Sequence, residues 1–227
     1  MSVSPSTVPS QAAAGSYGIE ADLPRNVPWW KRSFDLVLAV ILLLPLLVIM
    51  GVIALLIKAT SRGPIFFVQQ RVGLQGGTFD LLKFRTMSSD AEERLRNDSE
   101  LWKKYVENDY KLPEGDDPRQ TGIGTILRKT SLDELPQIFN ILKGEMSFVG
   151  PRPVVSWELE IYGEKAPIFL SARPGITGHW QVSGRSKINY PRRAELELEY
   201  VARQGFLFDL WILIKTVPVV LLGRGAH

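Results

Sequence analysis

Residues 36–57 read LVLAVILLLPLLVIMGVIALLI and contain no charged side chain. As a helix rising 1.5 Å per residue, this run is about 33 Å long, and the hydrocarbon core of a bilayer is roughly 30 Å thick. The run therefore predicts a membrane helix, for which a simple span is the default interpretation. Trp29 and Trp30 precede it, as interfacial anchors often do.

Pro45 favours a different path for this helix. Near the middle of the run it removes a backbone donor and clashes with the preceding turn, at a cost on the order of 3 kcal/mol, so we expect a kink. Both flanks are basic, with Lys31 and Arg32 before the run and Lys58 and Arg62 after it. Because cytoplasmic flanks carry positive charge, two ends on the same side satisfy this pattern. A re-entrant helix that enters and leaves one leaflet thus competes evenly with a span.

The composition limits the chemistry. The chain has 227 residues, 27 Lys+Arg against 24 Asp+Glu and a formal net charge of +3, which suits one globular domain with appendages. Since there is no Cys, disulfides, a thiol nucleophile and Cys-based metal sites are excluded, and two His exclude a polyhistidine metal cluster. Residues 1–28 are rich in Ser, Pro, Ala and Gly. They predict a disordered tail that is not a signal peptide.

The remaining pattern combines short strands with helices. Residues 65–70 and 78–84 predict two strands joined by a Gly-rich turn, and alternation then places Lys83 and Arg85 on one face. Residues 206–222 are apolar but interrupted by charges and a proline, so they predict either an interfacial amphipathic helix or a buried core helix. Further helices are expected at 90–108, from 131–133 to Gly144, at 154–162 and at 192–203.

Two adjacent carboxylates, Asp133 and Glu134, stand beside the cations Arg128 and Lys129. The simpler interpretation is structural, because Ser131 and Glu134 have the spacing of a capping box and acids in a first turn complement the helix dipole. The functional interpretation is that the helix N-terminus and nearby cations keep Asp133 ionised as a nucleophile, while Glu134 holds a divalent cation. Mg²⁺ suits such a site, because it prefers oxygen ligands and is usually held by one or two carboxylates plus substrate phosphates.

Several basic side chains suit phosphate binding. Arg152 stands between two prolines, so its backbone is restricted and its guanidinium is presented rigidly, as in a phosphate clamp. A structural turn with a surface Arg fits the same residues. The cations that would converge on a diphosphate are Lys83, Arg85, Arg128 and Arg152.

The stretch at 173–185, RPGITGHWQVSGR, is dense in turn, aromatic and polar residues. It predicts a nucleotide or sugar pocket in which a ring stacks on Trp180. Hydrogen bonds would come from Gln181 and Arg185, with Thr177 beside them.

Six stretches occur in a characteristic order: KRSFD (31–35), GPIFFVQQRVG (63–73), KFRTM (83–87), SLDELPQ (131–137), VGPRP (149–153) and the stretch at 173–185. Taken together, they resemble the bacterial sugar transferase family, and within it the monotopic polyprenyl-phosphate phosphoglycosyl transferases. The likeness covers roughly residues 29–225 and is strongest to the short members that start exopolysaccharide repeat units, such as undecaprenyl-phosphate galactose phosphotransferases.

The resemblance implies an α+β fold class: a membrane-inserted re-entrant helix–break–helix, broken at Pro45, and then a small mainly helical catalytic domain with a short β-hairpin and interfacial amphipathic helices. The implied division is the tail at 1–28, the membrane helix at 29–61 and the catalytic domain at 62–227, monotopic on the cytoplasmic face of the bacterial inner membrane. The family break often carries Ser-Pro, whereas this chain has Leu44 before the proline, which loses a helix-bending hydroxyl.

The resemblance also implies a reaction, in which a sugar phosphate passes from a UDP-sugar to undecaprenyl phosphate with release of UMP. Asp133 matches the acid that attacks the phosphate nearest the sugar and forms a covalent phosphosugar intermediate, and Glu134 matches the acid that binds Mg²⁺. The implied phosphate ligands are Arg128 and Arg152, with Lys83 and Arg85 as weaker candidates.

Other functions stay open on the sequence alone. A non-catalytic membrane scaffold that recruits later glycosyltransferases would not need Asp133, Glu134 and Arg152, and those enzymes are also expected partners of a transferase. Direct single-step transfer and hydrolysis of nucleotide sugars are further alternatives. Nucleic acid is not an expected partner, because the cations follow the membrane segment and the phosphate motifs. UDP-galactose is favoured over UDP-glucose as the donor, but no residue separates them.

Overall fold

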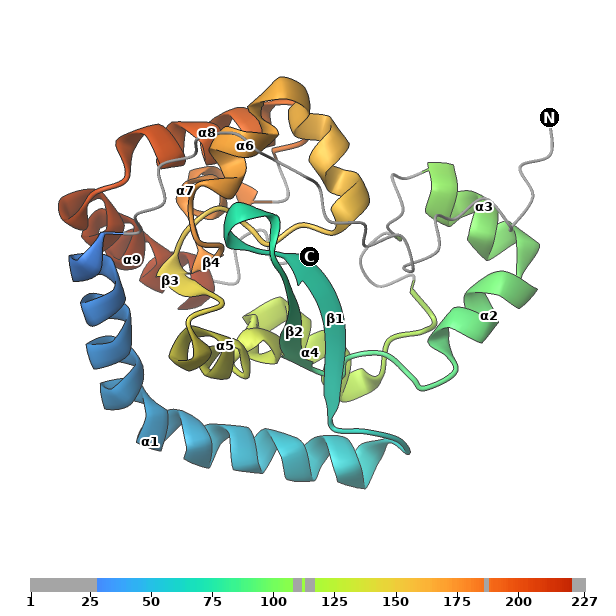
Figure 1. The fold of residues 1–227 in the computed structure, drawn as a ribbon. Coiled ribbons are helices and arrows are strands. Elements are labelled where there is room, and N and C mark those ends of the chain that lie inside the picture. The colour runs from blue at the N-terminus through green and yellow to red at the C-terminus, as the bar shows by residue number, and fades with distance from the viewer. Residues whose placement is uncertain (1–27, 108–111, 113–116, 186–187, 222–227) are drawn as a thin grey trace.

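The computed structural model describes residues 28–107, 112, 117–185 and 188–221, so the tail predicted at 1–28 lies almost wholly outside the described residues. These residues form a mainly helical α+β fold with one antiparallel and one parallel two-stranded sheet. Figure 1 shows the long helix α1 along two sides of the body, with β1 rising from its C-terminal end. The elements are α1 (Trp29–Thr60), β1 (Phe66–Val72), η2 (Leu74–Gly76), β2 (Thr78–Phe84), α2 (Ala91–Asn97), α3 (Ser99–Glu107), α4 (Gly122–Thr130), η3 (Leu132–Glu134), α5 (Gln137–Lys143), β3 (Ser147–Val149), η4 (Ser156–Lys165), α6 (Ala166–Leu170), β4 (Gly175–Thr177), α7 (His179–Ser183), α8 (Arg192–Arg203) and α9 (Phe206–Leu221).

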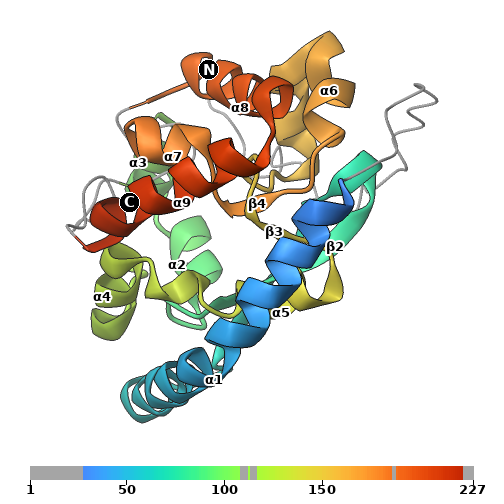
Figure 2. The same cartoon turned by 90° about the vertical axis from the view of Figure 1, so that its left-hand side faces the viewer.

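Helix α1 continues through Pro45 but is strongly bent, as Figures 1 and 2 show. The proline supplies the cause, since it removes a helical hydrogen bond and crowds the preceding turn. The predicted kink is confirmed, whereas the predicted break is a bend within one helix. Among the described residues, α1 is the one helix long and apolar enough to cross a membrane. Its outer face is apolar along both halves, with Val40, Leu44, Val48 and Leu55 all exposed.

Buried charges tie the first turn of α1 to the far end of the chain. Lys31 Nζ lies 2.5 Å from Asp209 Oδ2 in α9 and 3.1 Å from Tyr200 Oη in α8. Tyr200 also donates to Asp209 Oδ1 at 2.8 Å, and all three side chains are buried. Because a buried charge is costly unless it is paired and hydrogen-bonded, this trio fixes the position of α1 against α8 and α9. In Figure 2, α1 and α9 lie on the same side of the molecule.

Two more polar side chains of α1 reach the segments that build the site. Arg32 donates to two main-chain oxygens in the last turn of α5, at 2.6 and 2.9 Å. Carbonyls at a helix C-terminus lack partners within the helix, so Arg32 caps α5. Asp35 accepts hydrogen bonds from Ser147 Oγ and Phe148 N, both at 3.0 Å, at the start of β3.

Strands β1 and β2 pair antiparallel, with Phe66 opposite Phe84 and Val72 opposite Thr78, which confirms the predicted hairpin. Strand β2 packs against α5, and its buried side chains share one hydrophobic core with those of α1. The buried members of this core are Ala39, Met50, Ile53, Ile57, Phe79, Leu81, Phe84, Leu127, Ile138, Ile141 and Met146.

The helix predicted at 90–108 is two helices, α2 and α3, separated at Asp98. Asp98 has an extended backbone, and its Oδ1 accepts from the main-chain nitrogens of Glu100 and Leu101. This side-chain hydrogen bonding caps a new helix start and so competes with a continuous helix.

The C-terminal predictions have mixed outcomes. The helix expected at 154–162 is the 3-10 helix η4, interrupted by Gly163 at a φ of 50°, whereas α8 confirms the helix expected at 192–203. Helix α9 confirms the helix expected at 206–222. It is buried on one side through Asp209 and Ile212 and exposed on the other through Leu207 and Ile214, so a fully buried core helix is wrong.

Candidate active site

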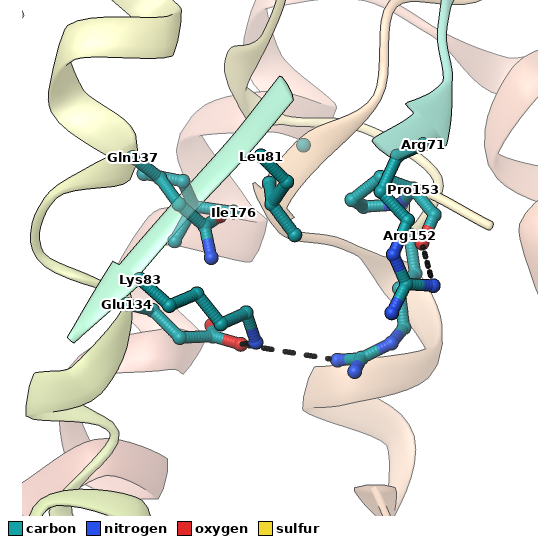
Figure 3. A pocket seen from close by; sticks show the side chains of 9 residues that line it. Arg71, Leu81, Lys83, Glu134, Gln137, Arg152, Pro153 and Ile176 are labelled. Carbon is teal, nitrogen blue, oxygen red and sulfur yellow. Dashed lines mark hydrogen bonds and ion pairs between the residues drawn. The ribbon is translucent and has the colours of Figure 1, made fainter. Parts of the chain in front are cut away.

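Glu134, Lys83 and Arg152 meet at one small pocket, although they come from three separate segments (Figure 3). Lys83 Nζ, from β2, lies 2.7 Å from Glu134 Oε1 in η3. The same oxygen is 4.0 Å from Arg152 Nη1. The structure thus brings two of the predicted cations onto the second predicted acid. The pocket is lined by Arg71, Leu81, Lys83, Glu134, Gln137, Arg152, Pro153, Gly175 and Ile176.

Ser131 turns the chain between α4 and the two acids. Its φ of 58° lies in the left-handed region, where it ends α4, and its side chain makes no cap hydrogen bond. An N-cap residue needs an extended backbone, and Glu134 is paired with Lys83 instead, so the predicted capping box is wrong. The single helix expected up to Gly144 is divided into η3 and α5, while Gly144 does end α5 with a φ of 88°.

The two carboxylates have displaced pKa values of opposite sign. Burial raises the pKa of Asp133 to about 6, opposed by Lys83 and Arg128 and reinforced by the charge of Glu134. Burial also acts on Glu134, but Lys83 and the neighbouring arginines outweigh it and hold the pKa of Glu134 below its ordinary value. The expectation that nearby cations determine the ionisation of Asp133 is therefore only partly met, because burial has the larger influence on its pKa. An acid poised near neutrality beside one that stays charged is typical of sites with divided roles.

The turn that carries Arg152 is held by unusually close main chains. Gly150 N donates to Thr177 O, and Gly175 N donates to Pro151 O, both at 2.9 Å. A Cβ on Gly150 would lie 2.2 Å from a main-chain oxygen, so no side chain fits there. The parallel pair β3 and β4 thereby fixes where this turn starts.

Arg85 is not brought to the acids. It is buried, and its Nη2 donates to Ser61 O at 3.2 Å and to Ser61 Oγ at 2.6 Å. The guanidinium fills the space beside Gly63, where a Cβ would lie 2.0 Å from Nη1. Strand β2 ends at Phe84, so strand alternation no longer relates Arg85 to Lys83.

Of the four residues predicted for a nucleotide or sugar pocket, Arg185 is near the acids. It helps to lower the pKa of Glu134. Burial lowers the pKa of Arg185 itself, and the charge of Glu134 opposes that shift. Thr177 is buried, with its hydroxyl 2.8 Å from that of a threonine in α9. Trp180 and Gln181 are buried as well, and the Arg193 guanidinium covers the Trp180 ring at 4.4 Å. In this structure one face of the Trp180 ring is covered by an arginine, and the ring is buried, so it is not presented for stacking.

Two pocket residues with polar side chains, Arg71 and Gln137, were not predicted from the sequence. The hairpin register contains the signal for Arg71. Phe67, Gln69 and Arg71 stand opposite Lys83, Leu81 and Phe79, so Arg71 shares a face with Lys83. Gln137 follows Glu134 by three positions, which is the spacing of one helical turn.

The acids supply the oxygen ligands that Mg²⁺ prefers, although the described residues contain no group of three or more His, Cys, Asp or Glu placed to hold a metal. A cation here would use Glu134, with Asp133 beside it, and the oxygens of a bound phosphate. The donor set fits that mode of binding. Lys83 would have to share Glu134 with the metal, because it already contacts Oε1.

Comparison with known proteins gives a consistent set of relatives. Residues 27–223 match the family described as bacterial sugar transferase. The exopolysaccharide production protein ExoY of Sinorhizobium fredii is 44% identical over 201 residues, covering 87% of this chain and 88% of the relative. The undecaprenyl-phosphate galactose phosphotransferase of Salmonella typhimurium is 43% identical over 207 residues, covering 89% of this chain and 43% of the relative. The undecaprenyl-phosphate glucose phosphotransferase of Komagataeibacter xylinus is 35% identical over 213 residues, covering 86% of this chain and 36% of the relative.

Proposed function

The chain belongs to the bacterial sugar transferase family, and we propose that it transfers a sugar 1-phosphate from a UDP-sugar to undecaprenyl phosphate with release of UMP. This would be the first membrane step of exopolysaccharide repeat-unit synthesis. The observation that carries the proposal is the meeting of Glu134, Lys83 and Arg152 beside Asp133. A pocket that combines acids with cations suits the transfer of a phosphosugar from one phosphate to another, because the cations can stabilise the negative charge of the phosphates.

We take Asp133 as the nucleophile. Its carboxylate would attack the phosphorus nearest the sugar, a phosphorus–oxygen bond to UMP would break, and a phosphosugar would remain on Asp133. An oxygen of undecaprenyl phosphate would then attack that phosphorus, and the bond to Asp133 would break with return of the carboxylate. A pKa of about 6 supports this role, since such an acid is mainly ionised at neutral pH yet is less solvated than an exposed one.

The cations would bind and orient the phosphates. Lys83 and Arg152 face the pocket, and Arg128 and Arg185 lie close enough to the acids to displace their pKa values. Mg²⁺, held by Glu134 and phosphate oxygens, would add charge stabilisation for the leaving UMP.

The apolar outer faces of α1 and α9 support a place on the membrane. The two helices lie on the same side of the molecule. Trp29 in α1 and Trp211 in α9 are exposed aromatic side chains of the kind that anchor proteins at a membrane interface. We infer that 29–61 forms a re-entrant segment and that 62–227 works on the cytoplasmic face of the inner membrane. A lipid phosphate at headgroup depth would then be within reach of the pocket.

Galactose is the preferred sugar in this proposal and glucose the second, because relatives of both names match the chain. Intact-protein mass spectrometry tests sugar and mechanism together. The protein is mixed with UDP-galactose or UDP-glucose and Mg²⁺ without lipid, and wild type is compared with Asp133→Asn. A hexose-phosphate adduct confined to wild type supports the covalent route. Normal lipid-dependent UMP release without an adduct favours direct transfer, and absence of both with either sugar refutes the donor assignment.

A further inference from the structure

Arg71 lines the same pocket as Glu134 and Arg152, at the end of β1 (Figure 3). Its side chain is mostly buried, 13% exposed, so its contacts are defined. Two roles are open to an arginine in this place. It can bind a substrate phosphate itself, or it can hold the neighbouring Arg152 in position.

The donors of Arg71 are directed at protein atoms. Nη1 donates to Pro153 O at 3.2 Å and to Glu158 Oε2 at 3.4 Å, and Nη2 donates to Gln69 Oε1 at 2.6 Å. Nε is buried and has no hydrogen-bond partner among the described residues. A phosphate entering the pocket would therefore find most of this guanidinium occupied or covered.

The main chain repeats the same connection. Val72 N donates to Val154 O at 2.9 Å, so the residues after Arg71 and Pro153 form a bridge between hairpin and turn. Glu158 Oε2, the carboxylate oxygen that Arg71 contacts, also accepts from Val155 N at 2.9 Å. The side chain of Arg71 and the main chain of Val72 thus both form hydrogen bonds to the residues immediately after Arg152.

We propose that Arg71 is a positioning residue for the transfer reaction, which clamps the turn at 150–153 and sets the Arg152 guanidinium against Glu134. This inference deepens the proposed function and rests on it for its kinetic part. Arginine suits the role because its planar fork serves several acceptors at once, which a lysine ammonium does not do in a fixed geometry. Arg71 also stays charged, since burial and the nearby Arg152 lower its pKa only to about 10.

A double-mutant cycle separates the two roles. Arg71→Gln, Arg152→Gln and the double variant are compared in UMP release with the lipid acceptor present, and Arg71→Lys and Glu158→Gln serve as conservative variants. Arg94→Gln, an exposed arginine in α2, is the matched control for loss of charge. Hydrogen exchange of the peptides covering 150–158 is measured in parallel, since it reports how readily the backbone of this turn opens and does not depend on enzymatic activity.

We expect Arg71→Gln to lower kcat/KM by about 10²-fold, a loss typical of a small misplacement of a reacting group, and Arg71→Lys to restore only part of it. Arg71→Gln should add less than about twofold to the effect of Arg152→Gln, because both changes disable the same guanidinium. Exchange across 150–158 should rise in Arg71→Gln and Glu158→Gln, but not in Arg94→Gln.

If the losses in kcat/KM of the two single variants multiply in the double variant, Arg71 acts as an independent phosphate ligand and the proposal is overturned. Unchanged exchange at 150–158 in Arg71→Gln would overturn it as well. If wild type released no UMP from a UDP-sugar, the proposed function would fail, while the exchange result would still decide whether Arg71 clamps the turn. Glu158→Gln keeps the test valid if Arg71→Gln does not fold, since Glu158 does not line the pocket.

Discussion

Replacing Lys83 by Met would change the ionisation of the proposed nucleophile without touching it. Burial is the main cause of the raised pKa of Asp133, and Lys83 is the strongest influence that opposes it. Lys83 also pairs with Glu134 at 2.7 Å, so its removal leaves two neighbouring carboxylates with less compensation. Both effects make ionisation of Asp133 harder, and its pKa should rise above the value of about 6.

The size of the change follows from the geometry. An opposite charge within a few ångströms lowers a carboxyl pKa by about 1–3 units, so Asp133 in Lys83→Met should titrate between about pH 7 and 9. The ionised fraction at pH 7 would fall from about 90% to between about 50% and 1%. Formation of the phosphosugar adduct at pH 7 should therefore slow by about 2- to 100-fold from ionisation alone, and the loss should shrink as the pH rises.

Single-turnover adduct formation, followed by intact-protein mass spectrometry from pH 5 to pH 9.5, measures this directly. Wild type should lose activity below about pH 6, and Lys83→Met should show the same decline at a higher pH. Lys83→Arg keeps the charge and should keep the wild-type profile. A uniform loss at every pH in Lys83→Met, with the profile unmoved, would refute the electrostatic reasoning and leave Lys83 as a phosphate ligand only.

Three further changes have defined outcomes. Asp133 has a pKa of about 6, above its ordinary value, so its ionisation destabilises the fold increasingly from about pH 4 to pH 6 and fully above that. Asp133→Asn should therefore raise the free energy of unfolding at pH 7.5 by at most about 3 kcal/mol, seen as a higher Tm, and should leave the Tm nearly unchanged at pH 4. Gly124→Ala should destabilise by about 1–3 kcal/mol or more in urea unfolding, because its Cβ would lie 1.9 Å from a main-chain oxygen, whereas Gly122→Ala in the same helix meets no atom within 4 Å and should be neutral or stabilising. Lys31→Met should cost about 3–5 kcal/mol by leaving the buried Asp209 without its charge partner, and adding Asp209→Leu should recover part of that loss; an equal loss in the double variant would contradict the pairing.

Local patterns predicted those parts of the fold that local chemistry determines. The hairpin and α8 follow from alternation and helical periodicity, and Gly144 ends α5 because it can adopt a positive φ. The bend in α1 follows from Pro45 alone. The helix predicted at 90–108 failed at Asp98, because a residue that caps a helix also interrupts one.

The candidate site was predictable in its residue types but not in its geometry. The Ser-x-x-Glu spacing of Ser131 and Glu134 indicates a capping box only if the serine is extended, and here it is left-handed. Lys83 and Arg85 are two residues apart, yet the strand ends between them at Phe84. The side chain of Arg85 therefore points away from the acids and binds Ser61. Arg71 could be assigned to the site only once the pairing register of the hairpin was known. That register depends on contacts between residues that the sequence pattern alone does not determine.

The pairing of Lys31 with Asp209 has a consequence for how the protein is made. The two residues are 178 positions apart, and a chain grows from its N-terminus. Helix α1 leaves the ribosome with its apolar face and its lysine long before the aspartate has been synthesised. During that interval water, or another polar group, has to solvate the ammonium group. The final position of α1 is therefore locked only when α9 has been translated, so truncation before α9 would leave a complete pocket sequence attached to an α1 that is not held in place.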